Sequence, residues 1–311
     1  MLAYILRRIF LMIPTLLIIS IISFAIIQLP PGDYLTTLEA NLAQTGEQVD
    51  QAQLEALRVR YGLDRPVYVQ YGMWIAGILH GDLGQSFAYN KPVTTLIGQR
   101  LALTMTIAVL TILLTWVIAL PIGIYSATHQ YSFFDYLLTL IGFIGMATPP
   151  FLLALVLLYF SYAYFGTSVG GLYSDAFADA PWTVARFIDL LKHIWVPIVI
   201  LATGGSAALI RGIRANLLDQ LQMPYVVTAR AKGLPEWRLL LKYPVRLAIN
   251  PMVSTIGWML PFIVSGSLIV DVVLSLPTIG PLLYNALMAQ DMFLAGSIVM
   301  ILSSLTVIGT L

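Results

Sequence analysis

The sequence predicts an all-α membrane protein with six membrane-spanning helices. Hydrophobic residues make up 59% of the chain and charged residues only 10%, and the mean hydropathy is +0.87. A soluble surface needs roughly a quarter of charged residues, so this composition indicates an integral membrane protein. Uncharged runs of about 18 residues or more, the length that a hydrocarbon core of ~30 Å demands, occur at residues 9–29, 101–128, 136–165, 193–210, 247–270 and 292–311.

The first run follows a basic N-terminus, as the apolar part of a signal peptide does. Arg7 and Arg8 precede it, but the run is long enough to cross a bilayer and holds no small-residue cleavage site. We therefore expect a spanning helix there. The sixth run ends at the last residue without a polar flank, which leaves open a continuation of the natural chain.

Composition and motifs exclude several classes of function. The formal net charge of +1 provides no global field for a nucleic-acid partner. The chain has no cysteine, no GxxxxGK[ST], HExxH or GxSxG motif, and its three histidines are scattered. The spans also lack the buried ionisable groups that ion-coupled carriers use. We therefore expect no catalytic residues, no metal and no cofactor bound by this chain, and uphill transport would need energy from a partner.

Basic residues near the ends of the spans predict the orientation of the chain. The positive-inside rule holds for short loops only. It therefore does not apply to the long segment at residues 30–100, but it does apply to the loop from 211 to 246. The positive-inside rule places that loop, and with it both termini, in the cytoplasm. Its basic residues are Arg211, Arg214, Arg230, Lys232, Arg238, Lys242 and Arg246.

The outer segment after the first span is expected to carry two short amphipathic helices. Its start, up to about residue 48, has the Pro, Gly and polar content of irregular chain. Asp50 can cap one helix, and Asp64 before Pro66 can start another. We expect their apolar faces to pack on the protein's own outer side. The residues of these faces are Leu54, Leu57 and Tyr61 in the first helix and Val67, Tyr71, Trp74 and Ile78 in the second.

Features inside the spans favour close helix packing. The rows Ala119, Gly123, Ala127 and Gly204, Ala208, Gly212 place small residues on one helix face, which lets backbones approach. Prolines interrupt several spans, and the pair Pro149 and Pro150 is the best candidate for a hinge; the others are Pro14, Pro121 and Pro261.

One acid lies near the outer end of the fifth span. Asp271 is either an intramembrane carboxylate, which would indicate function, or an interfacial one. The residues alone leave both readings open.

The basic segment from 211 to 251 is predicted to fold as a helix, a tight turn and a second helix. Pro224 precedes good helix formers, Gly233 supplies a left-handed helix end, and Pro235 opens the second helix. Such an element, joined to the fourth and fifth spans, can transmit a push from a soluble domain. Binding of anionic lipid by its basic residues is an equal alternative on physical grounds.

At these residues the chain resembles the ABC importer permeases of the oligopeptide/dipeptide (peptide/nickel) type. TARAKGL at 228–234, followed by Arg246 and Pro251, is similar to the cytoplasmic signature loop of that family. Several further motifs agree in order and in predicted topology, so the chain is identified as a member, similar to the first (B-type) permease subunit. These motifs are YILRRIFLMIP at 4–14, PGD at 31–33, YGLDRPVYVQY at 61–71, GDLGQSF at 81–87 and GSLIVDVVLSLPTIG at 266–280.

The resemblance implies the type I permease fold and a non-catalytic subunit in a bacterial or archaeal plasma membrane. Its implied segments are residues 1–29 with the first span, an extracytoplasmic insertion at 30–100, and a permease core at 101–311 with a coupling loop at about 211–250. Its implied partners are a second homologous permease, two ATPase subunits that use ATP and Mg, an extracytoplasmic substrate-binding protein and membrane lipid.

The resemblance also implies roles for individual residues. The loop would form the coupling helix that seats in the ATPase, through Tyr225, Thr228, Ala229, Arg230, Ala231, Lys232, Gly233 and Leu234. The chain departs from the family pattern toward the outer face, at Asp271, in 277–280 and before Asp291. We therefore expect the outer gate or binding-protein side at Asp271, Pro277, Gly280 and Asp291.

The expected cargo is di- or oligopeptides, carried by alternating access. The alternatives are oligosaccharides or nickel in the same importer class and, more distantly, an ATP-independent channel or carrier.

Overall fold

The chain folds almost entirely into helices in this computed structural model, which describes residues 2–45, 51–166, 170–177, 181 and 183–309. Across these residues no β-strand forms, and the one β-bridge joins Gln85 and Pro92. The predicted all-α class is therefore confirmed. The α-helices are α1 Leu2–Gln28, α2 Tyr34–Thr45, α3 Gln51–Tyr61, α4 Val67–Leu79, α5 Val93–Thr128, α6 Phe133–Ala147, α7 Pro150–Phe165, α8 Val184–Leu221, α9 Pro224–Ala231, α10 Glu236–Lys242, α11 Pro244–Val253, α12 Thr255–Gly266, α13 Leu268–Val273, α14 Ile279–Met288 and α15 Met292–Gly309, with a 3-10 turn at Asp175–Phe177.

Four of the described helices are long and apolar enough to cross a membrane alone, namely α1, α5, α8 and α15. Two bent pairs, α6 with α7 and α10–α11 with α12, raise the number to six if each pair is one span. All six predicted runs therefore fall on apolar helices, but the third and fifth runs are broken rather than continuous.

The break in the third run lies at the predicted hinge. The axes of α6 and α7 differ by 97° in direction. Thr148, which caps α6, is extended (φ −84°, ψ 118°), as expected for a residue before proline. Pro149 is also extended (φ −57°, ψ 133°), and neither Pro149 nor Pro150 has an N–H to continue the helix. The proline pair thus explains the bend, whereas Pro14, Pro121 and Pro261 lie inside continuous helices.

The break in the fifth run lies between α11 and α12. The bend there is 45° and falls at Ser254. Pro251 occupies the last turn of α11, where it removes a backbone donor from the helix ladder. An uncharged run therefore predicts a membrane segment but not that this segment is one straight helix.

The described residues form two compact units. The first comprises residues up to 104 together with those from 277 onward, and the second comprises 105–276. In the first unit, α1 and α14 pack on α15, and α2 packs on α3. In the second unit, α8 packs on α6, α7 and α11, while α13 packs on α7.

Helix α4 of the outer segment packs on membrane helices of the first unit. Trp74 of α4 is buried between Phe24 of α1, with which it stacks at 6.1 Å, and Gly296 of α15, where an added Cβ would lie 2.7 Å from the indole. The prediction that this helix packs on the protein's own spans is therefore confirmed.

Two expectations for the outer segment were wrong. Its start is helical, as α2, because Tyr34–Thr45 contains good helix formers despite its polar content. Pro66 rather than Asp64 caps α4. Asp50 lies outside the described residues.

The first row of small residues brings α5 against α8. A Cβ on Gly123 would lie 2.8 Å from Ile213 Cγ2 and 3.2 Å from the Ile210 carbonyl oxygen, while Ala119 is fully buried. The predicted close packing is thus confirmed for this row. In the second row Gly212 packs on Met252, as predicted, but Gly204 has open space beside it and lines an apolar pocket with α12, so the packing prediction was wrong at Gly204.

A prediction follows for the contact of α5 with α8. Replacing Gly123 by valine should force the two helices apart, and overpacking of this kind costs about 1–3 kcal/mol. Gly98 of the same helix has open space around it and provides the matched control. We expect the thermal unfolding temperature of the purified chain to fall clearly for Gly123→Val and little for Gly98→Val. An equal fall in both variants would contradict the packing account.

A second prediction concerns Asp291, which joins distant parts of the first unit. Its buried carboxylate accepts hydrogen bonds from Ser86 Oγ (2.5 Å), the Ala88 N–H (3.0 Å) and the Leu294 N–H (3.2 Å). Asp291→Ala leaves these donors without their acceptor, and each of the two buried ones, from Ser86 and Leu294, costs about 1–3 kcal/mol. Proteolysis within residues 84–92 should therefore accelerate, whereas the exposed Asp64→Ala, with the same charge change, should leave the rate unchanged. Equal rates in both variants would refute this role for Asp291.

Candidate functional site

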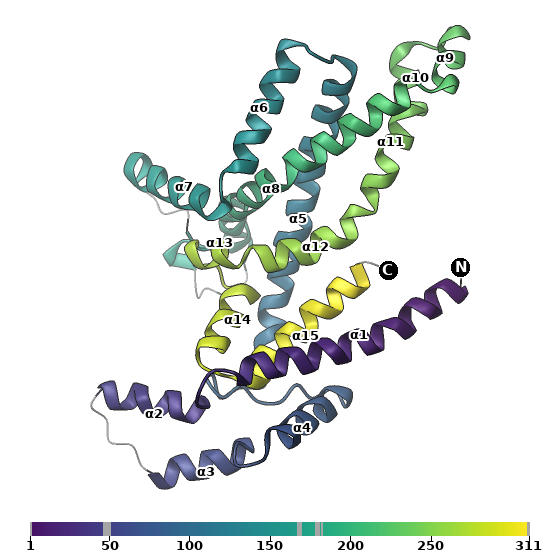
Figure 1. Cartoon of the computed structure of the whole chain (residues 1–311). Coiled ribbons are helices and arrows are strands. Elements are labelled where there is room, and N and C mark those ends of the chain that lie inside the picture. Colours follow the sequence, from purple (N-terminus) through teal and green to yellow (C-terminus); the bar gives the residue numbers. More distant parts are fainter. Residues whose placement is uncertain (1, 46–50, 167–169, 178–180, 182, 310–311) are drawn as a thin grey trace. The chain divides into compact units, whose positions relative to one another are not determined.

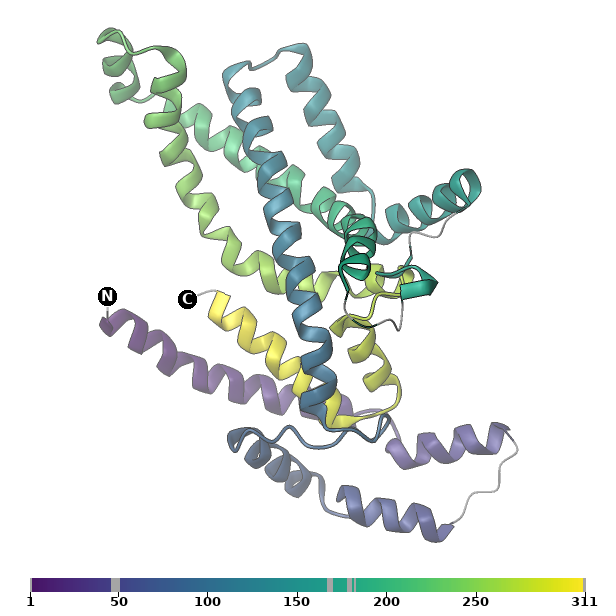
Figure 2. The same cartoon turned by 180° about the vertical axis from the view of Figure 1, so that it is seen from behind.

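The segment between α8 and α11 forms a helical hairpin, residues 222–243, which we call the α9–α10 hairpin. Pro224 occupies the first position of α9, where its missing N–H costs nothing. Pro235 precedes α10 in an extended conformation (φ −64°, ψ 139°). Figures 1 and 2 show the hairpin as a small cap at the joined ends of α8 and α11. The predicted helix, tight turn and second helix are therefore confirmed.

Gly233 closes the turn of the hairpin. Its φ of +76° lies in the left-handed region that favours glycine. The Gly233 N–H donates to the Arg230 carbonyl oxygen (3.0 Å), and the Leu234 N–H donates to the Ala229 carbonyl oxygen (3.4 Å). This is the Schellman pattern, which satisfies the last carbonyls of α9. The turn is therefore fixed by backbone geometry.

A small apolar core holds the two helices of the hairpin together. Val226 and Ala229 of α9 and Leu239 of α10 are buried against one another. Tyr225 lies at the edge of this core and donates its hydroxyl hydrogen to Gln220 Oε1 (2.7 Å). Burial raises the pKa of the Tyr225 hydroxyl above its usual range. Core, hydrogen bond and turn together hold the two helices of the hairpin against each other.

The opposite side of the hairpin is exposed. Arg230 forms a two-contact ion pair with Glu236, with Nε to Oε2 at 3.2 Å, and this hydrogen bonding raises the pKa of the Arg230 guanidinium. Large apolar side chains are exposed beside these charges: Val227 is 57% exposed and Trp237 is 61% exposed. This mixed face has no cover within the part of the chain that the structure describes.

The residues predicted to contact a partner thus divide between the two sides of the hairpin. Ala229 is buried and packs within the hairpin, while Tyr225 and Leu234 are half-buried at its core. The exposed members are Thr228, Arg230, Ala231, Lys232 and Gly233.

The predicted outer-side residues do not form one cluster in either unit. Asp271 belongs to the second unit, where it is 1% exposed and accepts a hydrogen bond from Ser267 Oγ at 2.9 Å. Pro277, Gly280 and Asp291 belong to the first unit. Pro277 is exposed, Gly280 lies in the first turn of α14, and Asp291 holds the loop at 86–88. Burial raises the pKa of the Asp291 carboxyl, although the hydrogen bonds from Ser86, Ala88, Leu294 and Phe87 favour the carboxylate.

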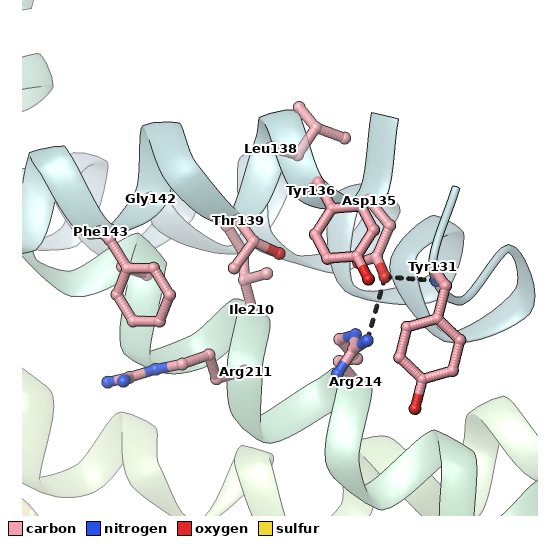
Figure 3. Close-up of a pocket in the computed structure, with 11 residues that line it drawn as sticks. Tyr131, Asp135, Tyr136, Leu138, Thr139, Gly142, Phe143, Ile210, Arg211 and Arg214 are labelled. Carbon is pink, nitrogen blue, oxygen red and sulfur yellow. Dashed lines mark hydrogen bonds and ion pairs between the residues drawn. The ribbon is translucent and has the colours of Figure 1, made fainter. Parts of the chain in front are cut away.

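An ion pair that the sequence did not predict joins α6 to α8. Arg214 Nη2 lies 3.0 Å from Asp135 Oδ2, and Asp135 is only 2% exposed. The Tyr131 N–H donates to the same carboxylate oxygen at 3.0 Å (Figure 3). The residues lie 79 positions apart, so only their opposite charges and their common place at span ends could have suggested the pair.

No group of three or more His, Cys, Asp or Glu side chains placed to hold a metal ion occurs among the described residues.

Comparison with known proteins gives two family matches along the chain. Residues 119–311 match the binding-protein-dependent transport system inner membrane component, and residues 1–108 match the N-terminal part of a membrane component of such systems. Together the two matches span nearly the entire chain.

Individual relatives agree with these family matches over nearly their whole length. The oligopeptide transport system permease protein AppB of Bacillus subtilis is 35% identical, over 100% of this chain and 95% of its own. A putative peptide permease protein of Brucella suis is 35% identical over 94% and 89%, and the dipeptide transport system permease protein DppB of Alkalihalophilus pseudofirmus is 31% identical over 94% and 90%. The chain therefore belongs to the family of inner membrane components of binding-protein-dependent transport systems, as a non-catalytic permease subunit.

Proposed function

We propose that this chain is a permease subunit of an ATP-driven ABC importer that carries di- or oligopeptides across the bacterial inner membrane, with the α9–α10 hairpin as its ATPase coupling element. The observation that carries the coupling proposal is a rigid hairpin with an uncovered, mixed apolar and basic face. The similarity to an oligopeptide and a dipeptide permease supports peptides over oligosaccharides or nickel.

The hairpin is built to transmit force. It follows directly on α8, a helix of 38 residues, and α10 packs on α11. A push on the hairpin therefore acts on two membrane helices at once. α8 in turn packs on α6, α7 and α11, so its displacement would move the second unit as a whole. This is the mechanical requirement of alternating access driven by a partner.

The exposed part of the predicted set supplies the contact with the ATPase. Thr228, Ala231 and Lys232 are exposed on or next to α9, and the Arg230 pair with Glu236 leaves the guanidinium partly accessible at the surface. Exposed Val227 and Trp237 add the apolar area that a protein groove would bury. Tyr225, Ala229, Gly233 and Leu234 then act by holding the hairpin in shape.

The remaining assignments follow from this proposal. The hairpin lies in the cytoplasm, so both termini are cytoplasmic, and residues 30–100 form the extracytoplasmic insertion before a permease core at 101–311. The partners are a second permease, two ATPase subunits that use ATP and Mg, and a substrate-binding protein.

Two further sites of movement and contact belong to the same proposal. The bend at Pro149 and Pro150 serves as a hinge. The outer gate or binding-protein contacts involve Asp271, Pro277, Gly280 and Asp291.

Gly233 provides the first test of coupling. Aspartate at Gly233 must adopt a strained left-handed backbone, which should deform the turn. Gly81 has the same conformation (φ +80°) and open space but lies in the outer segment, so Gly81→Asp is the matched control. In pull-downs of the intact complex, Gly233→Asp should lose the ATPase or uncouple its ATP hydrolysis, whereas Gly81→Asp should retain both. Normal coupling in Gly233→Asp would count against the proposal.

Ala231 separates the ATPase proposal from binding of the hairpin to lipid. Leucine at this exposed position preserves helix propensity and adds apolar surface, so it should strengthen insertion into a lipid interface but obstruct a fitted protein groove. We expect Ala231→Leu to lower the amount of ATPase that co-purifies with the chain severalfold, measured over a series of increasing salt concentrations. Ala163→Leu, at an exposed position of α7, is the control. Undiminished ATPase binding with tighter membrane binding would support the lipid reading instead.

A further inference from the structure

An apolar pocket lies between α8 and α12 within the second unit. Its volume is about 410 Å³, which falls in the range of small-ligand pockets, about 300–1,000 Å³. Residues of α5 and α11 complete its wall, and none of the residues that line it carries a charge. The pocket is separate from the α9–α10 hairpin, none of whose residues lines it.

The positions of the lining residues along α5 and α8 place the pocket inside the hydrocarbon core. Thr115 lies near the middle of the uncharged run at 101–128, and Gly205 lies within the run at 193–210. Gly205 follows Lys192 by about 20 Å along α8, at 1.5 Å per residue, in a core of about 30 Å. The two residues face each other, because a Cβ on Gly205 would lie 3.6 Å from Thr115 Cγ2. A solute that crosses the membrane along this unit would pass at this depth.

A bend in the backbone lies beside the pocket. The chain turns by 45° at Ser254, and Met252 and Thr255 on either side of the bend both line the pocket. The Thr255 hydroxyl donates to the Met252 carbonyl oxygen (2.6 Å), so the bend is stabilised locally. Irregular backbone at membrane depth occurs where it faces protein or a water-filled cavity, not where it faces lipid. The bend therefore favours a cavity for a solute over a surface for lipid.

The pocket also contains a polar group without a partner. Thr115 is 1% exposed, and its hydroxyl has no hydrogen-bond partner among the described residues. A buried hydroxyl that stays unpaired is costly and therefore uncommon in native proteins. The missing Cβ of Gly205 leaves this hydroxyl uncovered on the side of α8, since a Cβ there would lie 3.8 Å from Thr115 Oγ1. A ligand with a carbonyl oxygen would supply the partner.

The lining is suited to apolar groups of different shapes. Met252 and Met259 have flexible, polarisable side chains, which adapt to varied partners and are common at promiscuous binding surfaces. Trp258 is 49% exposed and adds an aromatic face, while Gly204 has no atom within 4 Å of the place that its Cβ would take. Such a surface fits an occupant that changes better than the fixed surface of a partner subunit.

We propose that this pocket receives an apolar side chain of a peptide during transport, with Gly204 and Gly205 as its floor and the Thr115 hydroxyl available to a carbonyl oxygen of the peptide. This inference rests on the proposed function, because it takes the cargo to be peptides. It adds a place in the membrane where the permease itself distinguishes peptides by the size of their apolar side chains.

Uptake of two dipeptides by the assembled transporter tests the pocket. The complete complex with its binding protein is reconstituted in proteoliposomes with ATP, and the uptake of alanyl-alanine and alanyl-phenylalanine is measured. Gly204→Ala and Gly204→Leu extend into open space, so neither meets a backbone clash. The ratio of alanyl-phenylalanine to alanyl-alanine uptake should fall about twofold for Gly204→Ala and about tenfold for Gly204→Leu, because the added carbon atoms occupy a hydrophobic pocket. Selection by the binding protein is the same in all variants and cancels in this comparison.

The control is Gly98→Leu, since Gly98 is also helical with open space around it but does not line the pocket. It should leave the ratio unchanged. Equal losses of both peptides in Gly204→Leu, or one ratio in all variants, would overturn the pocket proposal while peptide import by the wild type stands. Loss of the second permease from the purified Gly204→Leu complex would assign the pocket to a subunit interface and reject the proposal as well. Uptake of neither peptide by the wild type would instead refute the proposed function itself.

Discussion

The packing of α8 is the constraint on which the second unit depends. This helix contacts α6, α7 and α11, and its approach to α5 is possible only because Gly123 has no side chain to collide with Ile213. In a bilayer the hydrophobic effect does not drive helices together, so close contact and polar pairs must do so. The ion pair of Arg214 with Asp135 adds such a polar tie between α8 and α6. Whatever moves α8 must therefore move its neighbours.

The α9–α10 hairpin is joined to this packed unit at both ends, through α8 and through α11. Two backbone hydrogen bonds close its turn, and Val226, Ala229 and Leu239 fill its interior. Its second helix, α10, packs on α11. A rigid element of this kind can convert a movement of a docked partner into a displacement of membrane helices. If the hairpin couples the chain to an ATPase as proposed, buried Ala229 would act by holding the two helices together and not by touching the partner.

Much of this architecture could be predicted from the sequence, because a bilayer leaves few choices. Uncharged runs predicted the membrane segments. Pro224, Gly233 and Pro235 predicted the hairpin, because each of these residues strongly prefers a backbone conformation found at a helix end. Whether a membrane helix continues past a proline could not be predicted from the sequence in the same way. Pro121 leaves α5 continuous, whereas α6 and α7 meet at an angle of 97° at Pro149 and Pro150. The pair of Asp135 with Arg214 and the burial of Ala229 depend on contacts distant in the sequence, which no local pattern encodes.

We propose that the exposed face of the hairpin seats in an ATPase subunit, and a crosslinking experiment tests this contact directly. Because the chain has no cysteine, a single Ala231→Cys introduces a unique thiol on that face, and Ala229→Cys introduces a buried one two residues away. In native membranes, a thiol-specific photocrosslinker on residue 231 should attach to the ATPase subunit, and the yield should change when ATP is added, while residue 229 should react poorly. A functional transporter in which residue 231 crosslinks only to lipid would contradict the account.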